Sequence, residues 1–295
     1  MSEFRILYAL SPADAAGLAS FHRVATAALA FDGYAPFNEQ ALYDLQAGLR
    51  TAYLVQPNGD VVGAALAGRG EIDLVISPEY RRHGFGRTAF RKLAASESDA
   101  VTAWSHGDHP AARALAIELR FVAARTLLEL RKPLGAPEAE AGAAASASTT
   151  GETISGFRVG TDDEDWVALN ALVFASHPEQ GAITEADLAA RQAEDWFDAD
   201  DFLVLRDAAE RMIGYNWLKV DGAIGEIYVV GVHPDAAGRG LGRVLMQAGL
   251  QRLTDRGCTT AALYVEADSL GPVHLYRTLG FSDHTVDVQY RRLAD

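Results

Sequence analysis

The stretch VVGVHPDAAGRGLGRVL, residues 229–245, changes character twice within a short distance. An apolar run ends at Pro234, glycines follow at positions 238, 240 and 242, and an apolar pattern of helical spacing then begins. Proline cannot continue a central strand, and glycine lets backbone N–H groups converge without side chains in the way. The stretch therefore predicts a buried strand, a tight turn, and a helix that starts near Leu241.

A similar stretch with fewer glycines lies earlier in the chain. LVISPEYRRHGFGRTAF, residues 74–90, also passes from an apolar run through proline and glycine into a helical pattern. Pro78 precedes Gly84 by six residues, just as Pro234 precedes Gly240. Similar elements recur in the same order around both copies, which predicts an internal duplication of a mixed α/β unit.

The expected elements follow from apolar periodicity. In the first half we expect helices over 12–30 and 39–49, strands over 52–56, 61–67 and 71–76, a helix from 86, and a strand over 101–105. In the second half we expect helices over 163–174 and 184–195, strands over 202–206, 212–219 and 225–232, a helix over 241–256, and a strand over 260–266. Each half then closes with a short helix, a turn and a last strand.

Length and composition favour two domains. The chain has 295 residues, of which 49% are hydrophobic and 22% charged, the balance of an ordinary globular protein. Residues 133–153 are rich in Ala, Gly, Ser and Thr and have no large apolar residue after Leu134, so this segment cannot bury a core. We therefore expect an N-terminal domain at 1–133, a flexible linker at 134–153, and a C-terminal domain at 154–295.

Charge and cysteine content exclude several classes of partner and site. A formal net charge of −14 opposes binding to nucleic acid through phosphate contacts. The N-terminus has no signal-peptide pattern and no apolar run is long enough to span a bilayer, so we expect a cytoplasmic, monomeric protein without a membrane partner. Cys258 is the single cysteine, and the His and Asp residues of SHGDHP at 105–110 are explained as turn residues. We predict no metal site.

The glycine turn is suited to an anion. Free N–H groups and the positive end of the helix dipole converge at the start of the helix, where Arg239 and Arg243 add charge. A P-loop would need Gly-Lys-Ser/Thr, and a dinucleotide fingerprint would need a third glycine where Arg243 stands. A plain tight connection is the alternative, but the duplication favours a pyrophosphate site.

The pattern Val-x-Pro-x-x-[Gln/Arg]-x-x-Gly-x-Gly/Ala resembles motif A of the GNAT acetyltransferases, which bind acetyl-CoA by its pyrophosphate. The first copy fits at Arg81, Gly84 and Gly86, and the second fits except for Ala237 at the Gln/Arg position. The stretches YAPFNEQAL, HPEQG, WFDADDF, GEIYVVGVHP, LYVEAD and LYRTLGF resemble the mycothiol synthase family, tandem GNAT enzymes of actinobacteria. The resemblance covers nearly all of the chain outside the linker.

The resemblance implies an α/β fold of two tandem GNAT domains, each with a mixed sheet flanked by helices, and acetyl-CoA as cosubstrate. In the C-terminal domain it implies acetyl-CoA contacts by Val230, Gly231, Val232, Ala237, Gly238, Arg239, Gly240, Leu241, Gly242, Arg243, Ser269, Leu270, Gly271, Pro272, Val273 and His274. In the N-terminal domain the corresponding residues are Leu74, Val75, Ile76, Arg81, Arg82, His83, Gly84, Phe85 and Gly86. Ser269 stands where many GNAT proteins have Asn, and we expect it to cap the short helix.

The family's chemistry implies a base and an acid. An amine that attacks a thioester must be neutral, and the departing thiolate benefits from a proton. The resemblance assigns these roles to Glu226 and Tyr276. Their structural alternatives are a strand-edge carboxylate and a helix aromatic that packs on Phe281. The duplicate has Ala116 where Tyr276 stands, so we expect the N-terminal domain to lack catalysis, although it could still bind acetyl-CoA.

The family's acceptor is desacetylmycothiol, whose cysteinyl amine is acetylated to give mycothiol. The resemblance implies acceptor contacts by Glu39, Glu179, Lys219, Glu226 and Tyr264. Three of these residues also have an ordinary structural explanation. The alternatives are a first-turn position in a helix for Glu39, a charge at a strand end for Lys219, and an aromatic residue inside a strand for Tyr264. Two other functions stay open: a tandem GNAT enzyme for another small amine or a protein N-terminus, and an acetyl-CoA sensor without turnover. The base and acid pair argues against the sensor.

Overall fold

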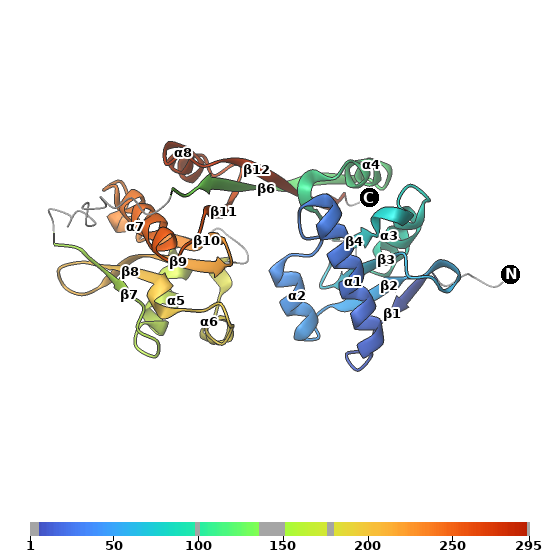
Figure 1. Cartoon of the computed structure of the whole chain (residues 1–295), viewed down its shortest axis with the longest axis horizontal. Coiled ribbons are helices and arrows are strands. Elements are labelled where there is room, and N and C mark those ends of the chain that lie inside the picture. The colour runs from blue at the N-terminus through green and yellow to red at the C-terminus, as the bar shows by residue number, and fades with distance from the viewer. Residues whose placement is uncertain (1–5, 98–100, 136–150, 176–179, 294–295) are drawn as a thin grey trace. The chain divides into compact units, whose positions relative to one another are not determined.

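The computed structural model describes residues 6–97, 101–135, 151–175 and 180–293 (Figure 1). The chain forms two compact units. The first unit contains Met1–Leu128, Glu266–Asp268 and Thr285–Asp295, and the second contains Glu129–Val265 and Ser269–His284. The predicted linker falls largely outside the described residues.

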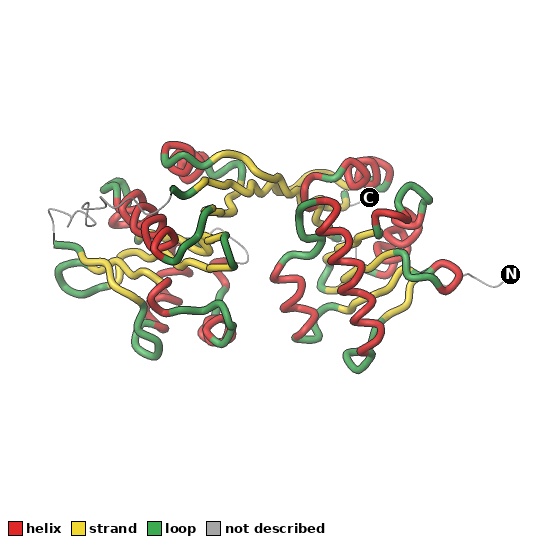
Figure 2. Tube along the Cα trace, viewed as in Figure 1, coloured by secondary structure: helices red, strands yellow, loops and turns green. Residues whose placement is uncertain are grey.

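The helices and strands, red and yellow in Figure 2, follow one another in the same order in both halves of the chain. The first half contains β1 (Leu7–Ala9), α1 (Ala15–Asp32), α2 (Glu39–Gln46), β2 (Thr51–Val55), β3 (Gly63–Gly68), β4 (Glu71–Ile76), α3 (Phe85–Ser96), β5 (Thr102–Ser105), α4 (Pro110–Glu118) and β6 (Phe121–Pro133). The second half contains β7 (Thr153–Gly156), α5 (Asp163–Val173), α6 (Glu185–Gln192), β8 (Phe202–Arg206), β9 (Met212–Asp221), β10 (Ile224–Val232), α7 (Leu241–Asp255), β11 (Thr260–Glu266), α8 (Leu270–Thr278) and β12 (Ser282–Arg292). The mixed α/β architecture and the duplication are confirmed.

Each unit has helices on both faces of a mixed sheet (Figure 1). In the first unit the strand order is β1-β2-β3-β4-β5, and in the second β11-β10-β9-β8-β7. Neighbouring strands are antiparallel except for the parallel pairs β4 with β5 and β10 with β11. The parallel pairs join the two strands that flank each glycine-turn helix.

Most of the last strand of the chain, from Thr285 onward, belongs to the first unit. Residues 288–291 of β12 pair antiparallel with β5. Asp287 accepts hydrogen bonds from the backbone N–H of Gly107 at 2.9 Å and from His106 Nδ1 at 2.8 Å. Burial opposes the charge on His106, but the hydrogen bond to Asp287 and the negative charges of Asp287, Asp73 and Glu71 together outweigh burial and raise the pKa of the imidazole. From the sequence we expected residues 154–295 to form one domain, whereas the structure groups Thr285–Asp295 with the first unit.

An aromatic core anchors the second unit. Trp166 of α5, Phe202 of β8 and Trp217 of β9 are fully buried. The ring of Phe202 stacks on Trp217 with centroids 4.4 Å apart, and Trp166 packs edge-on against Trp217 at 5.5 Å. Large apolar side chains that interlock in this way bury extensive surface and fix the position of their neighbours. The core therefore gives β9 and β10 a rigid base.

Candidate active site

The sheet of the second unit opens where the glycine turn begins. β10 pairs in parallel with β11 through Ile224 to Ile227, but β10 continues to Val232, so its last part diverges from β11. Across β9 the register shifts between Ile227 and Val229, which leaves Tyr228 as the extra residue of a β-bulge. The two strands are therefore unpaired at the carboxyl end of β10, next to the bulge, and we call this place the opening.

At the end of the glycine turn, the residue that precedes α7 has a backbone conformation that favours glycine. α7 begins at Leu241 as predicted, and Gly240 is its N-cap with a φ of 78°. Gly238 also has a positive φ, 75°. A Cβ built on Gly240 meets no atom within 4 Å, and within the described residues no side chain caps this end of the helix. The first N–H groups of α7 thus face an uncrowded region beside the opening, as an anion site requires.

Glu226 lies on the ladder just before the bulge. It is directly opposite Lys219 of β9 and Ala262 of β11. Partners across a ladder share a face of the sheet, and residues two apart on a strand do so too. Tyr264, which is 47% exposed, therefore shares the face of Glu226. The structure brings three predicted residues, Glu226, Lys219 and Tyr264, to one face.

The two faces of this sheet differ in the helices that cover them. Trp217, which shares the face of Lys219, packs in one apolar cluster with residues of α5 and α6. On the opposite face, Asn216 Nδ2 donates a hydrogen bond to the Leu245 carbonyl of α7 at 2.9 Å. Figure 1 shows α7 on one side of β8–β10 and α5 and α6 on the other. Glu226 and the start of α7 therefore approach the opening from opposite faces.

Tyr276 is a buried residue of α8. Its side chain is 8% exposed and packs edge-on against Phe281 with ring centroids 6.2 Å apart. Burial disfavours the phenolate and raises the pKa of Tyr276 to about 12. Ala116 has the same place in α4, because each helix has nine residues and each residue follows its helix start by the same interval. The correspondence expected between Tyr276 and Ala116 is confirmed.

Two arginines of the second unit that were predicted to bind acetyl-CoA contact other side chains of the protein. Arg239 forms an ion pair with Glu152, and an Arg243 guanidinium nitrogen donates to Thr278 Oγ1 of α8 at 2.6 Å. Leu270 to His274 form the first turns of α8. Ser269 is the N-cap residue of α8, but within the described residues its side chain makes no capping hydrogen bond, so the expected cap is wrong.

The first unit contains a cavity of about 760 Å³ at its own glycine turn. Of the residues predicted to bind acetyl-CoA there, it is lined by Leu74, Val75, Ile76, Arg81, Arg82, Gly84, Phe85 and Gly86. His83 is exposed and its Nδ1 lies 3.2 Å from the Tyr80 carbonyl oxygen. The Arg81 guanidinium makes two hydrogen bonds to Asp32, at 2.7 and 2.6 Å. The cavity includes all the predicted residues of this unit except His83.

The bulge identifies the counterpart of Glu226 in the first unit. Ile76 and Val232 end the two strands that lead into the turns. Glu71 precedes Ile76 by five residues, and Glu226 precedes Val232 by six, because the bulge adds one residue to β10. Glu71 therefore has the ladder position of Glu226.

In the first unit, an arginine side chain contacts the Glu71 carboxylate. Arg50 is 4% exposed, and its guanidinium forms ion pairs with Glu71 at 3.3 Å and with Asp73 at 2.8 Å. The Glu71 carboxylate is therefore engaged by a cation of its own unit. No local pattern in the sequence predicts this pairing, because Arg50 lies about twenty residues from Glu71 along the chain.

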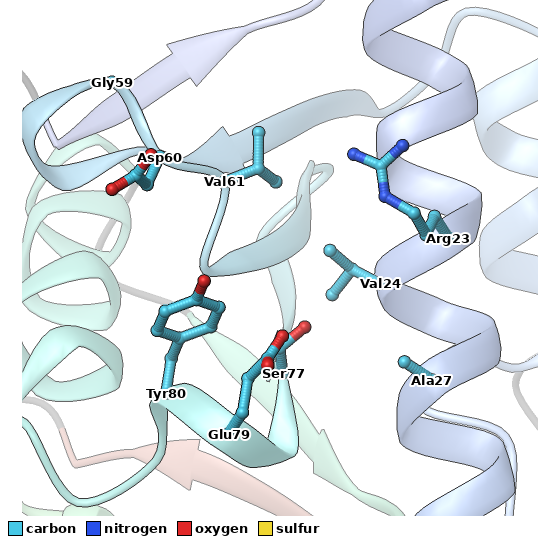
Figure 3. Close-up of a pocket in the computed structure, with 9 residues that line it drawn as sticks. All are labelled: Arg23, Val24, Ala27, Gly59, Asp60, Val61, Ser77, Glu79 and Tyr80. Carbon is cyan, nitrogen blue, oxygen red and sulfur yellow. The ribbon is translucent and has the colours of Figure 1, made fainter.

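A second pocket of about 350 Å³ lies between α1 and the turns after β2 and β4 (Figure 3). It is lined by Arg23, Val24, Ala27, Gly59, Asp60, Val61, Ser77, Glu79 and Tyr80. None of these nine residues belongs to the predicted site, and we assign no function to the pocket.

The remaining predicted residues have simpler positions. Glu39 begins α2, where its side chain lies 3.4 Å from the Tyr43 hydroxyl. Glu179 lies outside the described residues. In the described part of the chain, no helix is long and apolar enough to cross a membrane. The same residues contain no group of three His, Cys, Asp or Glu side chains suited to a metal.

Comparison with known proteins identifies the family. Residues 166–281 match the Acetyltransferase (GNAT) family. The chain is 48% identical to a mycothiol acetyltransferase of Clavibacter sepedonicus, over 91% of this chain and 90% of that protein. It is 41% identical to a mycothiol acetyltransferase of Salinispora arenicola, over 96% and 94%. The chain belongs to the mycothiol acetyltransferase family. Membership makes it an acetyl-CoA-dependent N-acetyltransferase.

Solved structures agree with the fold of this family. A tandem GNAT protein from the clavulanic acid biosynthesis pathway superimposes with a TM-score of 0.71 at 20% identity, covering 98% of this chain and 99% of that chain. A GCN5-related N-acetyltransferase from Sphaerobacter thermophilus gives 0.68 at 22% identity, covering 97% and 95%. At these identities the likeness concerns the fold, and it confirms two tandem GNAT domains.

Proposed function

We propose that the enzyme transfers the acetyl group of acetyl-CoA to the cysteinyl amine of desacetylmycothiol, giving mycothiol and CoA, and that the second unit carries out the reaction. The acceptor is supported by similarity to mycothiol acetyltransferases over nearly the whole chain. The location is supported by one observation above the others: Glu226 stands beside a β-bulge and a strand opening, whereas β4, which contains its counterpart Glu71, pairs with β3 without a register shift.

Glu226 is the proposed base. The cysteinyl amine is largely protonated near neutral pH and cannot attack until it loses a proton. The Glu226 carboxylate accepts this proton, directly or through a water, from the face covered by α5 and α6. The amine nitrogen then attacks the thioester carbonyl carbon and loses its second proton to solvent, and the carbon–sulfur bond breaks as the tetrahedral intermediate collapses to the amide. CoA leaves as a thiolate.

The turn at Gly240 is the proposed pyrophosphate site. The first N–H groups of α7 and the positive end of its dipole favour an anion. Because α7 covers the face opposite Glu226, acetyl-CoA would enter from one face and the acceptor from the other. The thioester then lies at the opening between β10 and β11, where both faces are accessible. The second-unit residues predicted to contact acetyl-CoA are proposed to line this path.

Tyr276 is the proposed acid that protonates the leaving thiolate. Replacing Tyr276 by phenylalanine keeps the ring against Phe281, so we expect kcat to fall only roughly tenfold, because CoA thiolate is a fair leaving group unaided. Since burial raises the pKa of Tyr276 to about 12, the phenol stays protonated throughout the usual assay range. Wild-type and variant pH profiles should therefore run parallel at high pH. A fall near pH 9 in the wild type alone would show that the phenol titrates there and contradict its raised pKa, whereas an unchanged kcat in the variant would contradict the role as acid.

The first unit is proposed to bind acetyl-CoA without turnover. Its cavity surrounds a glycine turn that copies the catalytic one, with Gly84 at a φ of 83°. The backbone of this turn is more strained than that of the glycine turn in the second unit. Arg82, with a φ of 67°, stands where the second turn has Gly238. Ala116 in place of Tyr276 and the pairing of Glu71 with Arg50 remove both proton-transfer groups.

Glu39, Glu179, Lys219 and Tyr264 are the proposed acceptor contacts, supported by the family resemblance. We extend the proposal to a cytoplasmic enzyme that acts as a monomer on a small molecule, in keeping with a net charge of −14 that opposes nucleic acid. Release of CoA thiol with and without desacetylmycothiol tests the proposed function. Thiol release that depends on this acceptor, with acetyl on its cysteinyl nitrogen by mass spectrometry, is expected; equal release without it would refute the proposal.

A further inference from the structure

A cluster of cationic and aromatic side chains lies on the acceptor face of the second unit. The Lys219 ammonium lies 4.9 Å from the centroid of the Trp196 ring and 5.8 Å from that of Tyr228. The two rings are themselves 5.2 Å apart and inclined at 57°. A cation against two aromatic rings is attracted by both quadrupoles, so its flexible side chain is held in one place. We call Trp196, Tyr228 and Lys219 the lysine platform.

The platform is fixed at its base. Trp196 and Tyr228 both pack on the fully buried Trp217, with centroids 5.7 and 5.3 Å away. Arg191 of α6 donates from Nε to the Tyr228 hydroxyl at 3.0 Å and from another guanidinium nitrogen to the Asp187 carbonyl at 3.0 Å. Tyr228 is therefore held from the sheet by Trp217 and from α6 by Arg191.

The β-bulge brings the platform next to the proposed base. Lys219 and Glu226 face each other across β9 and β10, and Tyr228 is the extra residue that follows. Strict alternation would send Ile227 and Tyr228 to opposite faces, with Tyr228 on the face of Glu226. Val229, after the bulge, also pairs with Trp217 on that face. The bulge thus places an aromatic residue and the next apolar residue on the same side, beside Glu226.

We propose that Trp196 and Tyr228 are positioning residues that hold the Lys219 ammonium for hydrogen bonds to the hydroxyl groups of a polyhydroxylated acceptor. This inference rests on the proposed function. An ammonium group donates three hydrogen bonds and accepts none, which suits sugar or cyclitol hydroxyls. Because Lys219 lies directly opposite Glu226, hydroxyl groups bound at the ammonium place the attached amine within reach of the carboxylate. The platform therefore sets both affinity and orientation.

The test separates acceptor binding from general stability. We expect Trp196→Leu to raise KM for desacetylmycothiol roughly tenfold, leaving KM for acetyl-CoA unchanged, because a desolvated cation–π contact is worth about that factor. Trp196→Phe keeps an aromatic face and should restore most of the loss. Phe197→Leu is the matched control: Phe197 packs on Trp217 at 5.9 Å from the same segment, and its loss should leave KM unchanged.

A double-mutant cycle and a truncated acceptor complete the experiment. If Trp196 acts through Lys219, Trp196→Leu should have no further effect on KM in a Lys219→Met enzyme. With cysteinamide, which lacks the sugar and cyclitol, kcat/KM should be low and the same for wild type and Trp196→Leu. Additive effects in the cycle, an equal loss with cysteinamide, or the same KM change in Phe197→Leu would each overturn the platform. A wild-type enzyme inactive with desacetylmycothiol would refute the proposed function instead.

Discussion

Replacing Glu226 by glutamine is expected to lower kcat/KM for desacetylmycothiol by about two orders of magnitude at pH 7, because general base assistance is typically worth ~10² to 10⁴ in rate. Glutamine keeps the size of the side chain and its place opposite Lys219. It cannot accept the proton of the acceptor amine. The loss should therefore appear in the chemical step, with KM for acetyl-CoA close to that of the wild type. Steady-state kinetics with both substrates varied measures it.

The duplication supplies a matched control for this variant. Glu71 has the ladder position of Glu226 in the first unit but is paired with Arg50. Glu71→Gln should leave the turnover number near the wild-type value. Because this substitution removes one partner of a buried arginine, thermal unfolding should be recorded alongside, and a lower Tm is expected. Equal losses of turnover in the two variants would contradict the assignment of catalysis to the second unit.

Replacing Gly240 by aspartate is expected to abolish measurable turnover. The N-cap of α7 favours a carboxylate, so the new side chain would occupy the proposed pyrophosphate position and repel the anion. Space is available for it, since a Cβ at Gly240 meets no atom within 4 Å. A φ of 78° costs a non-glycine residue about 1 kcal/mol, which the fold should tolerate. The measurement is KM for acetyl-CoA and residual kcat.

Two variants distinguish charge from backbone strain in this prediction. Gly240→Asn has the same shape and a similar tolerance of positive φ, but no charge, so it should keep more activity than the aspartate variant. Gly84→Asp places the same charge at the corresponding turn of the first unit, where φ is 83°, and should leave turnover measurable. An inactive Gly84→Asp enzyme together with an active Gly240→Asp enzyme would reverse the proposed roles of the two units.

The sequence predicted the parts of the fold that depend on local pattern. Strands 71–76, 202–206 and 260–266 have the predicted bounds, and α7 begins at Leu241 as expected. Apolar periodicity and the proline and glycine breakpoints are contained in short windows, so they can be recognised without tertiary information. β1 and β7 were missed because each is three or four residues long and only partly buried.

Features that depend on pairing between distant residues were not predictable in this way. The pairing of β12 with β5 joins residues more than 180 positions apart. The bulge at Tyr228 follows from a register shift that leaves no sign in the apolar alternation of β10. The ion pair of Arg50 with Glu71 and the contact of Lys219 with Trp196 likewise need the folded sheet. The family motifs indicated Glu226 and Lys219, but not the residues that fix their surroundings.

The dependence of kcat/KM on pH for Glu226→Gln, with desacetylmycothiol as acceptor, tests the central claim most directly. If Glu226 removes the proton of the attacking amine, the variant should be slowest relative to wild type near neutral pH and should recover as rising pH lets solvent deprotonate the amine. The gap between the two curves is then largest near neutral pH and narrows as the pH approaches the pKa of the amine. A variant whose profile overlays that of the wild type at every pH would contradict the account.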